Sequence, residues 1–375
     1  MSVAAFRPDR SACLAGDFAH RGSDTTESTR QWRATVRAHV LAELETFLTR
    51  NHIAPVRDIA VHDIARQYVG RGKCLRSTFM YLGWLCGADA DAAALRAAAG
   101  LELVHAFALI QDDVMDAARL RRGEPAAHVR FAARHRRADL PGDAHRFGES
   151  AATLVGDICL VWAEKMLRDS GVDRTALDRV WPQYDAMRVE LAVGQFADLL
   201  NDARAEPGLG AVLAVARAKS GNYTVRRPLE MGAAMAGCDE RTRTALGRYG
   251  CVVGEAFQLR DDILGAFGTA EVTGKPGDTD LGQRKATTVV VAALELADAA
   301  ARRELRTLLA TPELDTAAVA RLRTLIAATG AREHIEAMIS DRTAEARRIV
   351  ATACLPEPQR HLLDGMIRIC TTREM

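Results

Sequence analysis

Two pairs of adjacent aspartates each follow an apolar segment of the chain. Asp112 and Asp113 lie in the sequence LIQDDVMD, which continues to Asp116, and Asp261 and Asp262 lie in FQLRDDILG. Carboxylates in apolar surroundings are costly unless a cation compensates their charge. Both clusters are followed by basic residues, namely Arg121, Arg122, Lys275 and Lys285. This pattern predicts a divalent-metal site for a polyanionic ligand such as a diphosphate.

The spacing of the first cluster suits metal binding if the segment is helical. Each helical residue advances by about 100°, so Asp112 and Asp116 share one face while Asp113 lies to the side. His105 falls on nearly the same stripe. Carboxylates in this arrangement can bridge one or two Mg²⁺ ions that keep water and phosphate oxygens as further ligands. The alternative is a solvated helix end with ordinary ion pairs, which is what most acidic clusters are.

The second cluster offers fewer carboxylates, because Gly265 stands four residues after Asp261. Further cations occur at Lys73 and Arg76, three residues apart in GKCLRS, and at Lys219 within a helical run. Taken alone, each of these basic residues is more often a surface residue than a site residue. Their occurrence together with two aspartate pairs in one chain is what favours a polyanion site.

The overall charge is almost balanced. The 375 residues include 50 Lys and Arg against 49 Asp and Glu, a formal net charge of +1. No global field therefore favours nucleic acid or an anionic membrane surface, and we expect neither as a partner. Anion binding must come from local clusters.

The cysteines and the N-terminus indicate the compartment. The eight cysteines include no C-x-x-C pair, which favours buried thiols in a reducing environment. The first residues lack the continuous apolar core of a secretory signal. No stretch reaches the roughly 18 uncharged apolar residues that a membrane span needs. We therefore expect a cytoplasmic enzyme with no membrane span.

The elements that must position these residues are helices. Apolar residues recur at three- and four-residue spacing, and the chain has only 11 prolines. Residues 1–28 are polar and are predicted to form a flexible tail. Short breaks rich in Gly, Pro and Asp separate segments of helix length, without a long linker. The prediction is a single all-α domain over residues 29–375, with large-bundle architecture.

Beyond the tail, the chain resembles the trans-isoprenyl diphosphate synthases, or polyprenyl synthetases, over nearly all of its length. Gly72 to Ser77 is similar to the family's GKRLRP element, and Asp112 to Asp116 with Arg121-Arg122-Gly123 is similar to its first aspartate-rich motif. Other motifs follow in family order: Phe147 to Ser150 with Gly156-Asp157, Gly194-Gln195 with Asp198, Lys219-Ser220, Phe257-Gln258 with Asp261-Asp262, Gly274-Lys275 to Asp280-Leu281, and Lys285 to Thr287.

The resemblance implies an all-α isoprenoid synthase fold, a homodimer and a deep central cavity. It implies that isopentenyl diphosphate condenses head-to-tail with dimethylallyl, geranyl or farnesyl diphosphate and that pyrophosphate is released. Mg²⁺, three ions with substrate bound, would be held by Asp112, Asp113 and Asp116 and, opposite them, by Asp261 and Asp262. The allylic diphosphate would contact Arg121, Lys219, Gln258 and Lys275, with Lys219 counted among the catalytic residues. Isopentenyl diphosphate would be bound without metal by Lys73, Arg76, His105 and Arg122.

Several positions depart from the family pattern. Cys74 and Ser77 replace the commoner Arg and Pro, and Arg284 replaces a usual Gly before Lys285. Gly265 stands where the second motif often has a third aspartate, which resembles a variant of actinobacterial-type members. We expect activity to survive this loss of one carboxylate.

The residues before the first motif suggest a product length. A bulky residue at the fifth position before the motif, Phe107, with a small one at the fourth, Ala108, resembles short-chain synthases that stop near geranylgeranyl (C20) diphosphate. We therefore expect a C20 product. The alternative is that Phe107 simply packs in the core.

Two other functions share parts of this pattern. A class I terpene cyclase also binds a diphosphate through metal ions held by aspartates, but it does not need Lys73, Arg76 and His105 for a second diphosphate. A non-catalytic regulatory subunit of a heteromeric synthase tends to lose aspartates, whereas the first motif here is intact.

Overall fold

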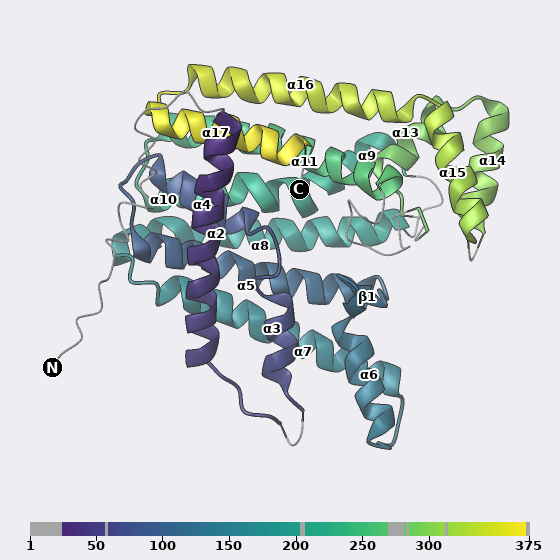
Figure 1. The fold of residues 1–375 in the computed structure, drawn as a ribbon, viewed down its shortest axis with the longest axis horizontal. Helices are drawn as coiled ribbons and strands as arrows, with labels where there is room; N and C mark the ends of the chain where they lie inside the picture. Colours follow the sequence, from purple (N-terminus) through teal and green to yellow (C-terminus); the bar gives the residue numbers. More distant parts are fainter. Residues whose placement is uncertain are drawn as a thin grey trace. The chain divides into compact units, whose positions relative to one another are not determined.

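The computed structural model describes residues 25–56, 59–202, 207–268, 281–282, 285–311 and 314–372 (Figure 1). Helices dominate these residues; a single two-stranded hairpin and one isolated bridge are the strand pairing among them. This confirms the predicted all-α class. Contacts between Cα atoms divide the chain into two compact units. The first unit holds Arg30–Val180 and Gly232–Gly237, and the second holds Ser23–Thr29, Trp181–Met231 and Cys238–Met375.

The helices and strands follow one another along the chain with short connections. The elements up to residue 168 are α2 (Thr25–Arg50), α3 (Val61–Tyr68), α4 (Leu75–Leu85), α5 (Ala92–Met115), β1 (Leu120–Arg121), β2 (Glu124–Pro125), α6 (Ala127–Arg137) and α7 (Ala144–Arg168). The later elements are α8 (Arg174–Asp202), α9 (Leu209–Val215), η1 (Ala216–Arg226), α10 (Arg227–Met235), α11 (Glu240–Phe267), α13 (Thr288–Leu296), α14 (Ala299–Ala310), α15 (Thr316–Ala328), α16 (Ala331–Thr352) and α17 (Glu357–Thr372).

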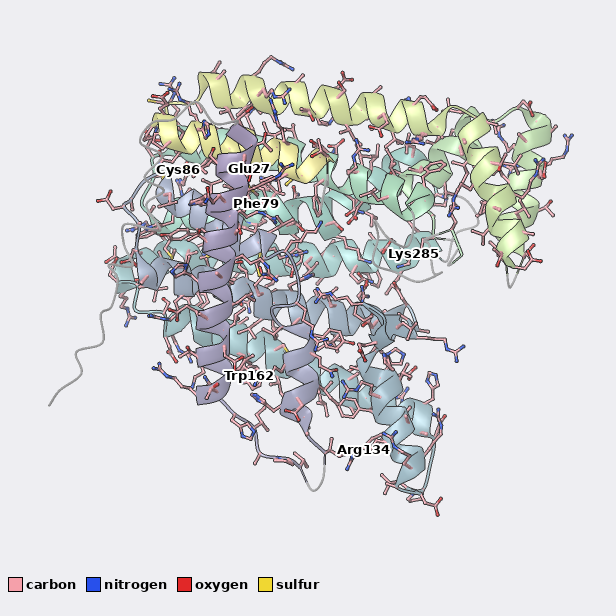
Figure 2. The ribbon with its side chains drawn as sticks, in the orientation of Figure 1. Glu27, Phe79, Cys86, Arg134, Trp162 and Lys285 are labelled. Carbon is pink, nitrogen blue, oxygen red and sulfur yellow. The ribbon has the colours of Figure 1, made fainter. Side chains whose placement is uncertain are left out.

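The first unit is built around α5, which packs along α7 and against α4 (Figure 1). The Asp91 side chain caps the start of α5 by accepting a hydrogen bond from the Ala94 N–H, as is usual for Asp at this position. Gly100 allows the two long helices to approach closely, since a Cβ there would lie 3.2 Å from the Ala163 carbonyl oxygen. On α7, Trp162 (Figure 2) is nearly buried and packs edge-on against the ring of Phe47.

Helix α5 passes the length and composition test for a membrane span. The prediction that no stretch of about 18 uncharged apolar residues occurs still holds along this helix, because Arg96 and Glu102 interrupt it. Moreover, 67% of the apolar window is buried inside the fold, with Leu101, Leu103 and Val104 fully or almost fully covered. Such burial is typical of a core helix.

The second unit centres on α11, which packs against η1 and α16. Helix η1 is a π-helix within a continuous helical run from α9 to α10. Its last turn bonds the Arg227 N–H to the Asn222 carbonyl, five residues back. Pro228 follows at once, and its ring can neither donate nor fit against the carbonyl of an ordinary α-turn. The wider π-turn accommodates the proline.

Glycines bring η1 and α11 into backbone contact. A Cβ at Gly221 would lie 2.8 Å from the Gly254 carbonyl carbon, and a Cβ at Gly254 would collide with the backbone of Gly221. One turn earlier, a Cβ at Gly250 would meet the Cα of Arg226. Side chains cannot fit there, so the register between the two helices is fixed by these glycines.

Helix α2 begins at Thr25, within the stretch that the sequence assigns to a tail (1–28). Thr26 and Thr29 are buried, and the hydroxyl of Thr29 lies against Gly365 on α17. The Ser28 hydroxyl and His361 Nε2 are 2.9 Å apart. The rest of the expected tail lies outside the described residues, and the single domain over 29–375 stays a prediction.

Candidate active site

The first aspartate cluster lies at the C-terminal end of α5. Asp116 is the C-cap residue, and its N–H donates to the Asp112 carbonyl at 2.8 Å. Asp112 and Asp116 are partly exposed, whereas Asp113 is completely buried. The helical spacing predicts a shared face for Asp112 and Asp116; the structure leaves both partly exposed and turns Asp113 inward.

Asp113 is held by an arginine and a tyrosine. Its Oδ1 accepts from Nε of Arg121 at 2.8 Å and also from Nη2, and its Oδ2 accepts from the Tyr68 hydroxyl at 3.0 Å. Burial raises the pKa of Asp113, and the hydrogen bonds from Arg121 and Tyr68 oppose that rise. Arg121 also reaches Asp112, with Nη2 3.3 Å from Oδ2. Tyr68 was not predicted as a site residue, because nothing local links it to a carboxylate 45 positions away.

Arg121 and Arg122 lie on the β1–β2 hairpin that follows α5. Arg121 pairs with Glu124, so Arg122 and Gly123 form a two-residue turn, both with positive φ (54° and 79°). Two-residue hairpin turns of this kind require φ > 0 at both central positions, which costs an arginine about 1–2 kcal/mol. The turn brings Nη2 of Arg122 to 3.3 Å from where a Cβ of Gly72 would lie.

The residues predicted to bind isopentenyl diphosphate are gathered within the first unit. His105 on α5 has a pKa well below its usual value, because of burial first and then the charges of Arg76, Arg122 and Arg121. Its imidazole is therefore neutral near pH 7. Burial and the charges of Arg121 and Arg71 also lower the pKa of Arg122. Lys73 is exposed just before α4. Crowded cations of this kind suit an anion that would relieve their repulsion.

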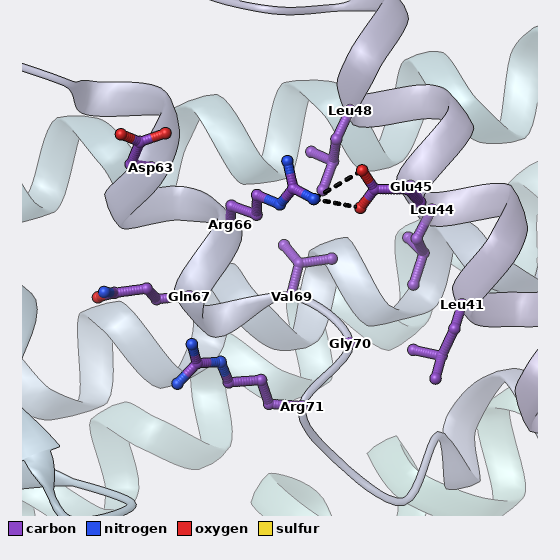
Figure 3. Close-up of a pocket in the computed structure, with 10 residues that line it drawn as sticks. All are labelled: Leu41, Leu44, Glu45, Leu48, Asp63, Arg66, Gln67, Val69, Gly70 and Arg71. Atoms are coloured by element: carbon purple, nitrogen blue, oxygen red, sulfur yellow. Dashed lines mark hydrogen bonds and ion pairs between the residues drawn. The ribbon is translucent and has the colours of Figure 1, made fainter.

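A small pocket opens beside these arginines and is lined by Tyr68, Arg71, Arg121 and Arg122 among others. A larger pocket of about 520 Å³ lies between α2 and α3 (Figure 3). Leu41, Leu44 and Leu48 line it, and on one side Nη2 of Arg66 donates to both carboxylate oxygens of Glu45. None of the predicted site residues lines the larger pocket.

The second aspartate cluster lies near the C-terminal end of α11. Asp261 is partly exposed and Asp262 is buried. Asp262 accepts from the N–H and the hydroxyl of Thr288 (2.9 and 2.6 Å) and from the Gln258 amide at 2.8 Å. Burial raises the pKa of Asp262 to about 6. Gln258, predicted to contact substrate, thus supports Asp262 here, and Thr288 was not predicted.

Lys219 lies on the π-helix η1 of the second unit. Its Nζ forms an ion pair with Asp198 on α8 at 2.6 Å. A Cβ at Gly194, one turn before Asp198, would lie 2.8 Å from the Lys219 backbone nitrogen. The sequence identifies Asp198 only as part of the motif that begins at Gly194-Gln195, without a role. The ion pair with Lys219 adds Asp198 to the candidate site. Lys275 lies outside the described residues.

Oxygen ligands for a divalent metal are present in both clusters. Among the described residues, no three His, Cys, Asp or Glu side chains converge into a group that could hold a metal ion. Mg²⁺ usually takes one or two carboxylates and completes its octahedron with water and substrate phosphate oxygens. Asp112 with Asp116, and Asp261, are accessible enough for that role.

The fold is that of the all-α isoprenoid synthases. The chain superposes on a geranylgeranyl pyrophosphate synthase from Corynebacterium glutamicum, solved with isoprenyl diphosphate and magnesium, with a TM-score of 0.83 and 32% identity. The superposition covers 94% of this chain and all of the other. This confirms the predicted fold class.

The sequence comparisons define the family. The profile described as Polyprenyl synthetase matches residues 59–326. A geranylfarnesyl diphosphate synthase from Aeropyrum pernix is 31% identical over 285 residues, 75% of this chain and 83% of the relative. A geranylgeranyl diphosphate synthase from Mycobacterium tuberculosis is 33% identical over 291 residues, 77% of this chain and 76% of the relative. The chain belongs to the polyprenyl synthetase family.

The family and its relatives make the chain a trans-prenyltransferase, a prenyl diphosphate synthase. This confirms the main functional prediction, and none of these comparisons supports a terpene cyclase or a regulatory subunit.

Proposed function

We propose that this enzyme condenses isopentenyl diphosphate with an allylic diphosphate head-to-tail and releases pyrophosphate. The observation that carries the proposal is the pairing of two different kinds of anion site in the first unit. Asp112 and Asp116 offer oxygen ligands to a metal-bound diphosphate. Arg76, Arg121 and Arg122 place their positive charges around the neutral His105, and Glu102 is the carboxylate that acts on Arg122. A reaction with one ionising and one non-ionising diphosphate needs both.

The metal is proposed to be Mg²⁺, three ions with substrate bound. It would be held by the accessible Asp112, Asp116 and Asp261; the C. glutamicum neighbour was solved with magnesium. When bound, the metal neutralises the diphosphate that leaves. Asp113 and Asp262 are both buried and hydrogen-bonded, so we assign them a supporting part: Asp113 orients Arg121, and Asp262 orients Gln258.

The protein's own groups supply binding and orientation. Arg121 and Lys219, with Gln258 and Lys275, are proposed to contact the allylic diphosphate, and charge-assisted donors of this kind stabilise the leaving pyrophosphate. Lys73, Arg76 and Arg122 would grip isopentenyl diphosphate. His105, being neutral, would donate one N–H to it without adding charge. The double bond of isopentenyl diphosphate then attacks the allylic carbon as the C–O bond to the allylic diphosphate breaks. The condensed isopentenyl unit loses a proton to the departing pyrophosphate.

A direct assay tests this function. The purified protein is incubated with labelled isopentenyl diphosphate and Mg²⁺, and with dimethylallyl, geranyl or farnesyl diphosphate in separate reactions. We expect labelled linear prenyl diphosphates with at least one of these primers. Cyclic hydrocarbons made without isopentenyl diphosphate would indicate a cyclase. No turnover with any primer would contradict the proposal and indicate a regulatory subunit.

The product is proposed to be geranylgeranyl diphosphate. Relatives include synthases of farnesyl, geranylgeranyl and geranylfarnesyl diphosphate, so family membership leaves the length open. Phe107 and Ala108 are only partly buried on α5, whereas Ala106 and Ile110 are completely covered. Phe107 is therefore not a plain core residue, which favours a role as the floor for the growing chain.

Replacing Phe107 by alanine is expected to lengthen the product by at least one five-carbon unit, because it removes the proposed floor. Product length is read by chromatography after dephosphorylation. Leu109→Ala is the matched control, since Leu109 lies on the other side of α5 from Phe107 and should leave the product unchanged. An unchanged product from Phe107→Ala would assign chain length to other residues.

We also propose that the enzyme is a cytoplasmic homodimer. The cysteines of the described chain are all free thiols, as in a reducing compartment. On α8, Val189, Val193, Phe196 and Leu200 form an apolar stripe at helical spacing, and Phe196 is 64% exposed. Exposed apolar residues in such a row are typical of a protein interface.

Phe196→Glu is expected to convert the dimer to monomer, because it would place charges in the apolar centre of the interface. Light scattering coupled to size exclusion measures the mass in solution. Leu296→Glu, at another exposed apolar residue, is the control and should leave the mass unchanged. A wild-type monomer would refute the dimer directly.

A further inference from the structure

Tyr68, the last residue of α3, lies in the middle of a buried hydrogen-bond chain. Its hydroxyl oxygen accepts from the Ala127 N–H at 2.8 Å, and its hydroxyl donates to Oδ2 of Asp113 at 3.0 Å. Tyr68 is 7% exposed, Ala127 1% and Asp113 0%. A phenol has one hydrogen to donate. Because the backbone N–H points at the phenol oxygen, that hydrogen is directed at the carboxylate.

The same carboxylate holds Arg121 through its other oxygen. Nε of Arg121 is 2.8 Å from Oδ1 of Asp113, and Nη2 contacts Oδ1 as well as Oδ2 of Asp112. One polar chain therefore connects the first residue of α6, the end of α3, the end of α5 and the β1–β2 hairpin. Arg121 is its outer end, and 26% of its side chain is exposed.

The order of this chain matters for binding. An arginine has many rotamers, and ordering one when a ligand arrives reduces the affinity. A carboxylate that is itself fixed from behind holds the guanidinium in one orientation before substrate binds. Tyr68 and Asp113 perform this fixing from inside the protein, and the exposed part of Arg121 lines the small pocket with Arg122.

We propose that Tyr68 is a positioning residue for prenyl transfer, which acts through Asp113 to hold Arg121 ready for the allylic diphosphate. This inference rests on the proposed role of Arg121. A purely structural Tyr68 would only tie the start of α6 to α3. The two roles differ in what Tyr68→Phe changes: a structural role alters stability alone, whereas a positioning role also alters the KM for one of the two substrates.

The first test compares Tyr68→Phe with Tyr81→Phe. Tyr81 is a buried tyrosine of α4 in the same unit, and the control loses the same oxygen atom away from Asp113. We expect Tyr68→Phe to raise the KM for the allylic diphosphate about tenfold, the size expected for one lost hydrogen bond to a charged group. The KM for isopentenyl diphosphate and kcat should change less than about twofold. Tyr81→Phe should leave both KM values unchanged. An unchanged allylic KM in Tyr68→Phe overturns the proposal.

A double-mutant cycle with Arg121→Lys then tests the path. Lysine keeps the charge but cannot make the paired contacts of a guanidinium. If Tyr68 acts through Arg121, Tyr68→Phe should have little further effect on the allylic KM in the Arg121→Lys background. Additive effects overturn the proposal. If Arg121→Lys alone leaves the allylic KM unchanged, the assignment of Arg121 in the proposed function is what fails.

A second variant approaches the chain from its centre and guards against misfolding of Tyr68→Phe. Asp113→Asn keeps the size of the side chain but cannot accept from both Tyr68 and Arg121 through two carboxylate oxygens. Assayed at saturating Mg²⁺, it should also raise the allylic KM and leave the KM for isopentenyl diphosphate unchanged. An unchanged allylic KM in this variant contradicts the proposal. Unfolding temperatures of all variants show that each is folded under the assay conditions.

Discussion

Asp112→Asn is expected to lower kcat by about 100- to 1,000-fold, the effect of losing about 3–4 kcal/mol of electrostatic stabilisation in the transition state. Asparagine keeps the size of the side chain but loses the negative charge that would hold the metal ions of the bound diphosphate. Asp112 is partly exposed at the end of α5, and Nη2 of Arg121 lies 3.3 Å from its Oδ2. The concentration of Mg²⁺ for half-maximal activity should rise as well. Steady-state kinetics over a magnesium titration measure both quantities.

The control for this prediction is Asp178→Asn, which changes an exposed aspartate of α8 and should leave kcat unchanged. Asp113→Asn is informative beside it. If Asp113 mainly orients Arg121, its loss should raise the allylic KM without changing the magnesium requirement. Full activity of Asp112→Asn would remove the central premise of the proposed function.

Gly254→Ala is expected to destabilise the protein by about 3 kcal/mol, at the upper end of the range for overpacked sites. The added Cβ would collide with the backbone of Gly221 on η1, and backbone cannot move aside as a flexible side chain can. Lys219 lies on η1 two residues before Gly221, so the shift should also displace its ammonium group and lower kcat. Urea unfolding at equilibrium gives the loss of stability, and the same samples give kcat.

Gly210→Ala is the matched control within the same helical run. Gly210 lies in α9, and a Cβ there would meet nothing within 4 Å. Alanine in an exposed helix should therefore raise the stability by about 0.5–1 kcal/mol. Equal stability of Gly254→Ala and the wild type would show that η1 can move away from α11 at little cost.

Helical periodicity predicted much of the first site. It placed Asp112 and Asp116 on one face and Asp113 to the side, and in the structure Asp112 and Asp116 are partly exposed while Asp113 is buried. It could not show what Asp113 faces, because Tyr68 lies 45 residues away on another helix. Nor could it predict the left-handed turn at Arg122, since arginine has no local preference for positive φ.

The second site depended even more on contacts between distant segments. The sequence placed Asp261 and Asp262 together on a helix, with Gln258 one turn before. The packing of the helices decides that Asp262 is buried and accepts a hydrogen bond from Thr288. It also decides that Lys219 pairs with Asp198.

The sequence by itself determined the helical class, the chemical types of the site residues and their spacing along each helix, since these depend on neighbours within a few positions. Tertiary structure decided which carboxylates face solvent, which are anchored by partners, and which arginine orients which acid. These outcomes depend on burial and on hydrogen bonds between residues far apart in the chain, where desolvation makes an unpartnered charge too costly to keep.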